Sequence, residues 1–316
     1  MVRRVQTHLV TLSKLCQTPA RCWYASRGLF RTAFDVSSLR TLRLLMTRWF
    51  TTAVVLWGFL TVAFERPASA QGVIWKLPED GTWVRYEGTY KQIETRASSG
   101  QADLEIEWIQ HLTIKSVGKQ EAEYEGKTVP CRWLEIKVQT GKKSEAGINP
   151  GPVGQTIYKV LVPEHRVVGK LEDEETIPVS YLSIVKGFRK EGAKEVEPLT
   201  GSVLQIYPKI ALIRYYPTLE KDGEAENLDL TTGAVAAQKW KGKHEAENLQ
   251  NHTIQEAELW RSDDTPFGLA QWSVKITMER KNDKEPRSSF KQVCQTLVEM
   301  KQLEVGTDAK SELESQ

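Results

Sequence analysis

The sequence predicts a mainly β protein, built as an antiparallel, strongly curved sheet with one short helix. Three observations carry this prediction: polar and apolar residues alternate over long stretches, β-branched and aromatic residues concentrate in them, and turn-forming residues separate them. Because each stretch has one polar face, antiparallel pairing is favoured over a parallel sheet, which is usually covered on both faces. A β-sandwich is the alternative arrangement.

The clearest alternation lies in residues 102–117. One face carries Leu104, Ile106, Trp108, Gln110, Leu112 and Ile114. Side chains of a strand alternate between its two faces, so this pattern predicts a half-buried strand. Further strands are expected over residues 82–91, 131–139, 155–162, 203–214, 252–260 and 270–279. Residues 288–301 suit a helix or a strand, and a final strand is favoured.

One stretch departs from the alternation. From Pro178 onward, apolar residues recur every three positions up to Phe188, and Gly192 follows. Proline near the start and glycine after the end are helix signals, so a short helix is predicted over 178–190. The polar residues from Gly306 onward are expected to form a mobile tail.

The N-terminal part has the features of an export signal. Residues 53–64 are apolar and uncharged, but a membrane-spanning helix needs roughly 20 such residues. An A-x-A triplet ends at Ala70, so cleavage is expected between Ala70 and Gln71. The sequence therefore predicts an exported protein, periplasmic or extracellular, without a stable transmembrane anchor. A buried core helix is the alternative for the apolar run.

The expected cleavage defines the domain organisation. Residues 1–45 are rich in arginine and similar in composition to a transit peptide, or they are an extension ahead of a true start at Met46. Residues 46–70 would then be the signal peptide. A single β-rich domain is expected over 71–303, followed by a tail over 304–316.

The charge is divided unevenly along the chain. Of the 43 Lys and Arg residues, ten lie within residues 1–70, together with two of the 41 acids. The remainder has 33 basic and 39 acidic side chains, a net charge of −6. Phosphate binding needs clustered basic residues, so no nucleic-acid partner is expected.

Two cysteines, Cys131 and Cys294, remain after the expected cleavage. An even number of cysteines in an oxidising compartment predicts one disulfide between them. Two independent buried thiols are the alternative.

Residues 228–300 carry a hairpin pattern. Leu228 to Lys243 reads LDLTTGAVAAQKWKGK, and Glu258 to Val274 reads ELWRSDDTPFGLAQWSV. The turn of this pattern consists of Trp260, Asp263, Asp264, Pro266, Phe267 and Gly268. It resembles exported bacterial proteins of the lipoprotein-carrier-like type and uncharacterised families of that shape. The resemblance implies a half-open β-barrel that holds a short helix. Such families often carry a cysteine after the first glycine, where this chain has Ala236-Ala237.

The sequence offers no catalytic signature. Serine-hydrolase, zinc-protease and phosphate-loop motifs are missing. His111 and Glu107 share one strand face but would lie roughly 13 Å apart, too far to share one metal ion. No catalytic residue, cofactor or metal ligand is therefore predicted.

The remaining signal is aromatic. The concave side of a curved sheet suits acyl chains, and its predicted lining is Trp108, Leu112, Ile114, Leu134 and Ile136. We therefore expect a non-enzymatic envelope protein that binds a lipid or other apolar ligand. A structural or protein-interaction module of the envelope is the first alternative. A secreted hydrolase or carbohydrate binder is the second.

Overall fold

The computed structural model describes residues 72–96, 100–145, 147–151, 154–167, 181–216 and 218–313. All of them belong to one compact unit, Phe64–Gln316. The extension over 1–45, the signal peptide over 46–70 and the cleavage point lie outside the described residues. Within the described ranges, no helix is long and apolar enough to cross a membrane.

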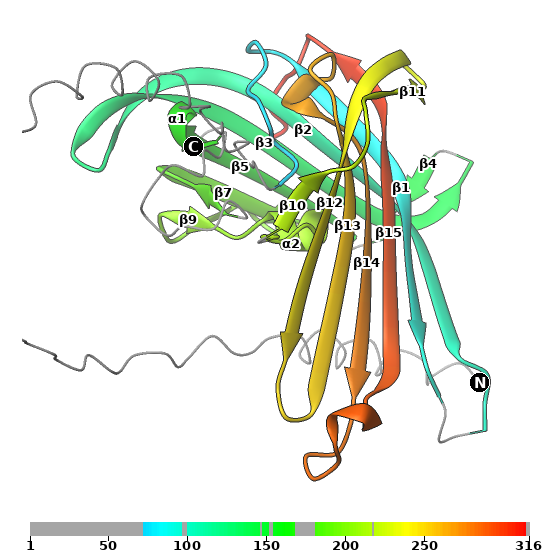
Figure 1. The fold of residues 1–316 in the computed structure, drawn as a ribbon. Coiled ribbons are helices and arrows are strands. Elements are labelled where there is room, and N and C mark those ends of the chain that lie inside the picture. The colour runs from blue at the N-terminus through cyan, green and yellow to red at the C-terminus, as the bar shows by residue number, and fades with distance from the viewer. Residues whose placement is uncertain are drawn as a thin grey trace, which may run out of the picture. The chain divides into compact units, whose positions relative to one another are not determined.

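A single 13-stranded sheet forms the unit (Figure 1). Its strands follow the order β10-β12-β13-β14-β15-β1-β2-β3-β5-β7-β8, while β11 pairs with β12 and β4 with β3. The bounds are β1 Trp83–Glu94, β2 Leu104–Tyr124, β3 Lys127–Ser144, β4 Gly147–Asn149, β5 Gln155–Pro163, β7 Lys186–Glu191, β8 Glu197–Pro198, β10 Thr218–Lys221, β11 Glu226–Leu230, β12 Gly233–Glu247, β13 Asn251–Arg261, β14 Leu269–Arg280 and β15 Lys291–Gly306. Every pairing between these described strands is antiparallel.

The sheet is curved and open. In Figure 1, β12 to β15 and β1 run side by side, while β2 and β3 bend across toward β5 and β7. β10 and β8 are the two ends of the strand order and do not pair with each other. The predicted mainly β, antiparallel, curved fold is confirmed, and one large sheet is present instead of two stacked ones.

Short elements complete the unit. They are the helices α1 Glu164–Val167 and α2 Tyr207–Ile210, the 3-10 turns η2 Pro266–Gly268 and η3 Arg287–Ser289, and the two-stranded sheet of β6 Leu182–Ser183 with β9 Val203–Leu204.

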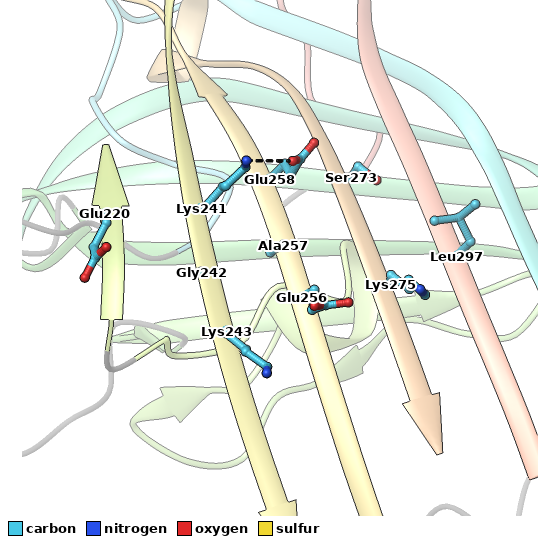
Figure 2. Close-up of a pocket in the computed structure, with 10 residues that line it drawn as sticks. All are labelled: Glu220, Lys241, Gly242, Lys243, Glu256, Ala257, Glu258, Ser273, Lys275 and Leu297. Carbon is cyan, nitrogen blue, oxygen red and sulfur yellow. Dashed lines mark ion pairs between the residues drawn. The ribbon is translucent and has the colours of Figure 1, made fainter. Parts of the chain in front are cut away.

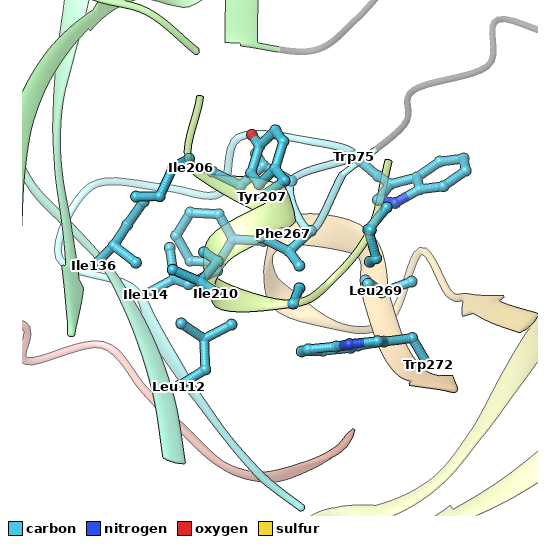
Figure 3. Close-up of a cluster of buried hydrophobic side chains, with 14 of the residues drawn as sticks. Trp75, Leu112, Ile114, Ile136, Ile206, Tyr207, Ile210, Phe267, Leu269 and Trp272 are labelled. Atoms are coloured by element: carbon cyan, nitrogen blue, oxygen red, sulfur yellow. The ribbon is translucent and has the colours of Figure 1, made fainter. Parts of the chain in front are cut away.

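The hydrophobic core lies on one face of the large sheet, which we call the inner face. Its fully buried side chains include Val84, Tyr86, Leu112, Ile114, Leu134, Ile136, Trp272 and Val274. Residues 72–77 pack on this face, and so do residues 181–184 and 199–216, which lie before β7 and after β8; we call these segments together the cover. The cover contributes Val73, Ile74, Trp75, Leu182, Ile206, Tyr207, Ile210 and Tyr216 to the same core. Figure 3 shows cover side chains against those of the sheet.

Two local predictions are wrong, and both concern the cover. Residues 203–214 contain only the short β9 and then α2, in which Pro208 sits in the first turn. Proline has no N–H group to donate to a sheet ladder. The described part of the predicted helix over 178–190 contains β6 and the beginning of β7. Its apolar residues serve two layers, because Leu182 lies in the core while Phe188 stacks on Trp133 across the other, outer face.

The chain after β15 is anchored, in contrast to the mobile tail expected from Gly306. Residues 307–313, the C-terminal strap, lie on the outer face. The carboxylate of Glu135 is fully buried there and accepts hydrogen bonds from Ser311 Oγ (2.8 Å) and from the backbone N–H groups of Glu312 (2.9 Å) and Leu313 (3.2 Å). Leu313 is 3% exposed, and its carbonyl accepts a hydrogen bond from Lys159 Nζ (2.6 Å).

An ion-paired carboxylate strengthens the strap. Glu312 accepts hydrogen bonds from Lys115 Nζ (2.7 Å) and Lys137 Nζ (2.8 Å). Partial burial raises the pKa of Glu312, but the hydrogen bonds from the two lysines outweigh it, and the net pKa lies below the usual value.

The predicted disulfide between Cys131 and Cys294 is not formed. Cys131 lies opposite Gln120, near one end of β2. Cys294 lies opposite Glu94, which pairs with Leu104 at the other end of β2. These two positions on β2 are separated by roughly 50 Å along the strand, at about 3.3 Å per residue. A disulfide needs Cα atoms within about 7 Å.

Candidate functional site

Four of the five predicted lining residues are part of the core. Leu112, Ile114, Leu134 and Ile136 are each 0% exposed. Figure 3 shows Ile206 and Ile210 of the cover among them, next to Phe267. These four side chains are not available to a ligand, because the chain itself fills this part of the concave surface.

The fifth residue, Trp108, lies beyond the end of the cover. It is half-buried and pairs in register with Tyr90 of β1. The same face continues along the strands past these two residues, and Figure 1 shows β13 to β15 and β1 extending well beyond α2. We call this part of the inner face the open floor. Its apolar side chains, all half-buried, are Tyr90, Leu104, Ile106, Trp108, Ile276 and Met278.

A pocket of about 180 Å³ lies where the cover meets the open floor. Its lining residues are Tyr90, Trp108, Gln110, Thr140, Lys209, Ile210 and Leu212. The rings of Tyr90 and Trp108 lie 5.2 Å apart at 54°, a tilted contact that is favourable for two aromatic rings. Pockets that enclose a drug-sized ligand measure roughly 300–1,000 Å³. This pocket can therefore hold only one end of a ligand, and the rest would lie on the floor.

Two glutamines fix the end of the cover above the pocket. Gln110, only 7% exposed, donates from Nε2 to the carbonyl of Ile210 (3.0 Å). Gln255 donates to the carbonyl of Leu212 and to the hydroxyl of Tyr216 (3.0 Å). The sequence contains a signal for the boundary between the cover and the open floor, and the sequence-based prediction did not use it. Gln110 is the polar residue on an otherwise apolar strand face. The floor residues of β2, from Trp108 back to Leu104, directly precede it in the sequence.

The end of the cover that borders the pocket, which we call its lower end, is cationic. Lys209 and Arg214 are both exposed there, and neither side chain has an ion-pair partner in the described part of the chain. Partial burial lowers the pKa of His244 on β12, and the charge of Arg214 lowers it further, so Arg214 lies near this strand.

A larger hollow of about 590 Å³ lies on the outer face of β12 to β15, opposite the floor (Figure 2). Its charged residues are Glu220, Lys241, Lys243, Glu256, Glu258 and Lys275. Charges of both signs alternate across neighbouring strands, as in the pair of Lys241 with Glu258 (3.8 Å). Exposed pairs of this kind contribute little and stay solvated. We therefore regard this hollow as a water-facing surface.

The hairpin motif has a structural role. Pro266–Gly268 forms the turn η2, and Phe267 adopts a φ of +59° with its side chain fully buried. Its carbonyl accepts hydrogen bonds from the N–H groups of Trp75 (2.7 Å) and Lys76 (3.3 Å). The turn therefore holds residues 72–77 of the cover against the sheet.

The other motif residues support the same hairpin. Trp260 donates from Nε1 to Glu226 (2.6 Å), and the N–H of Asp264 donates to Ser262 Oγ (3.2 Å). Asp263 makes a contact of 3.5 Å with Arg261.

Histidines and carboxylates form pairs across strands in the described ranges, and no group of three or more metal-ligating side chains gathers there. His111 lies 2.5 Å from Glu87 of β1, and His252 lies 2.7 Å from Glu279 of β14. Both contacts join directly opposite residues of paired strands.

Neither the protein-family models nor the curated proteins contain a match to this chain. The resemblance to lipoprotein-carrier-like proteins stays a prediction.

Proposed function

We propose that this chain is an exported, non-enzymatic protein of the cell envelope that binds an apolar ligand on the open floor. The observation that carries the proposal is the half-buried Tyr90–Trp108 pair, placed at a pocket on the face that is otherwise the hydrophobic core. Soluble proteins rarely leave extended apolar patches exposed unless the patch binds something.

Two properties of the open floor favour binding: its apolar area and its preorganisation. Each Å² of apolar surface removed from water contributes about 25 cal/mol, so covering even part of the floor with an acyl chain is favourable. The floor belongs to long paired strands, and Gln110 and Gln255 tie the cover in place beside it. A surface that is already ordered loses little conformational entropy on binding.

The same geometry sets the mode of binding. With a pocket of about 180 Å³, the ligand is not enclosed. An acyl chain would lie along the strands over Trp108 and Ile106, with one side left in contact with water. We therefore expect a carrier-like surface that releases its ligand readily.

Fluorescence titration with a long-chain fatty-acid analogue tests the proposal. The purified protein should bind the probe, and Trp108→Ala should weaken binding by at least about tenfold. Trp133→Ala is the matched control, because Trp133 stacks on Phe188 on the outer face at 6.4 Å. Absence of binding, or equal binding by the Trp108 and Trp133 variants, contradicts the proposal.

The export part of the proposal rests on the apolar run and the A-x-A triplet before Gln71. N-terminal sequencing of the native protein should give Gln71 as the first residue. Recovery of the uncut chain inside the cell contradicts export.

A further inference from the structure

The charged groups around the open floor are nearly all of one sign. Among the inner-face positions of β12 to β15, β1 and β2 beyond the cover, the acid is Glu94, at the far end of β1. It accepts a hydrogen bond from Gln92 Nε2 (2.9 Å). These described strands of the floor therefore place no carboxylate of their own near the pocket.

Lys209 is the cation at the pocket itself, where Thr140 and Trp108 are two of its neighbours in the lining. Glu191 is the acid whose pKa responds to the charge of Lys209, but Glu191 is already bound to Lys194 (2.9 Å) and Arg189 (3.2 Å). Lys209 is therefore not the ion-pair partner of this carboxylate. A long lysine stem can lie on apolar surface while its ammonium group reaches an anion.

We infer that the ligand of the open floor is an amphiphile with an anionic head group, which Lys209 recognises at the pocket. This inference rests on the proposed function and narrows it. The Lys209 ammonium would donate a charge-assisted hydrogen bond to a carboxylate or phosphate oxygen, and the Thr140 hydroxyl offers a second donor. The chain of the ligand would then run over the Tyr90–Trp108 pair toward Ile106.

Arg214 extends the same cationic edge. It follows Lys209 on the cover and lies near His244 of β12, so both cations belong to the lower end of the cover. A neutral apolar ligand would gain nothing from either group. An anionic one is attracted from a distance of about one Debye length, roughly 8 Å at physiological salt.

The experiment compares head groups on one chain length. A bound fluorescent fatty acid is displaced from the full protein by a long-chain fatty acid, by its methyl ester, and by a lysophospholipid whose head is a phosphate monoester. The wild type should bind the acid about fivefold more tightly than the ester, the range of a partly exposed ion pair. Lys209→Gln should remove this preference, so that the acid and the ester bind with equal affinity.

A matched control is Lys221→Gln, because Lys221 lies over the ring of Trp240 (5.7 Å), away from the floor. It should keep the preference for the acid. Circular dichroism checks that each variant folds, which is expected because both lysines are exposed.

The outcomes separate the two proposals. Equal binding of acid and ester by the wild type overturns the head-group inference and leaves the proposed function standing. Failure of every ligand overturns the proposed function. A preference that survives in Lys209→Gln overturns the assignment to Lys209. Tighter binding of the phosphate monoester than of the carboxylate supports the inference with a phospholipid source, and the reverse order supports it with a free fatty acid.

Discussion

Replacing Glu135 by glutamine should destabilise the protein through the C-terminal strap. The Glu135 carboxylate accepts hydrogen bonds from Ser311 Oγ and from the N–H groups of Glu312 and Leu313, and Lys115 Nζ lies 3.1 Å away. Glutamine keeps the size of the side chain, but its NH₂ group cannot accept from these donors. The variant therefore leaves donors unpaired in a buried place.

The expected loss in the free energy of unfolding can be worked out from these contacts. A hydrogen bond to a charged group contributes about 1.5–3 kcal/mol, and a group left unpaired when buried costs about 1–3 kcal/mol. Since glutamine retains one acceptor oxygen, we expect a loss of about 3 kcal/mol in the free energy of unfolding. For a domain of this size, that loss corresponds to about 6–12 °C in Tm.

A double-mutant cycle with a truncation identifies the cause. Removing residues 307–316 deletes the Ser311, Glu312 and Leu313 donors, so Glu135→Gln in the truncated chain should cost no more than about 1 kcal/mol, from Lys115 alone. Urea unfolding of the four proteins gives the coupling energy. A cost below about 0.5 kcal/mol in the full chain, or the same cost in both chains, refutes the role assigned to the strap.

Two further predictions concern pH and backbone geometry. The pKa of Glu312 is lowered in the folded state, so its contribution is present above the unfolded value of 4.5 and is lost as the pH falls through the folded pKa. Hydrogen exchange should therefore show the strap opening in acid, and Glu312→Gln should remove that dependence, whereas an unchanged acid profile in the variant contradicts it. Gly268→Ala should destabilise by about 2 kcal/mol, because φ is +79° and the added Cβ would lie 2.9 Å from Trp75 Cβ. Gly100→Ala, at φ +64° with no neighbour within 4 Å, is the control and should cost less in thermal unfolding; an equal cost shows that the contact with Trp75 is unimportant.

Most of the sheet could be predicted because strand alternation is a local property. In the sequence of residues 102–117, polar and apolar residues alternate. In the structure, burial alternates in the same way: Leu112 and Ile114 are fully buried, whereas Glu105 and Glu107 are exposed. The curvature and the antiparallel pairing follow from the same one-sided pattern.

The cover could not be predicted, because it has no period of its own. Residues 181–184 and 199–216 supply single apolar side chains, such as Ile206 and Ile210, to positions that the sheet leaves unfilled. The spacing of these apolar residues along the sequence depends on the shape of the concave face, so it shows neither a helix nor a strand period. The predicted helix over 178–190 came from such a coincidence of spacing.

The candidate site was located in part. Trp108 lines a pocket, and its role in ligand binding stays a prediction, whereas the four other predicted lining residues are covered by the chain. Alternation shows which residues share a face; it does not show how far along the strand a covering segment reaches. The disulfide prediction failed for a similar reason, because counting cysteines gives no information on the strand register that separates Cys131 from Cys294.

The pairing of β1 with β15 has a consequence for biosynthesis. Trp83 lies opposite Gly306, so β1 cannot complete its pairing until β15, which lies far downstream in the sequence, has been translated. Until then β1 presents one complete row of unsatisfied N–H and C=O groups, which is a template for incorrect pairing. A fragment that ends between β5 and β15 would retain this open edge and should aggregate, and the intact chain should fold slowly, as contacts of large sequence separation require.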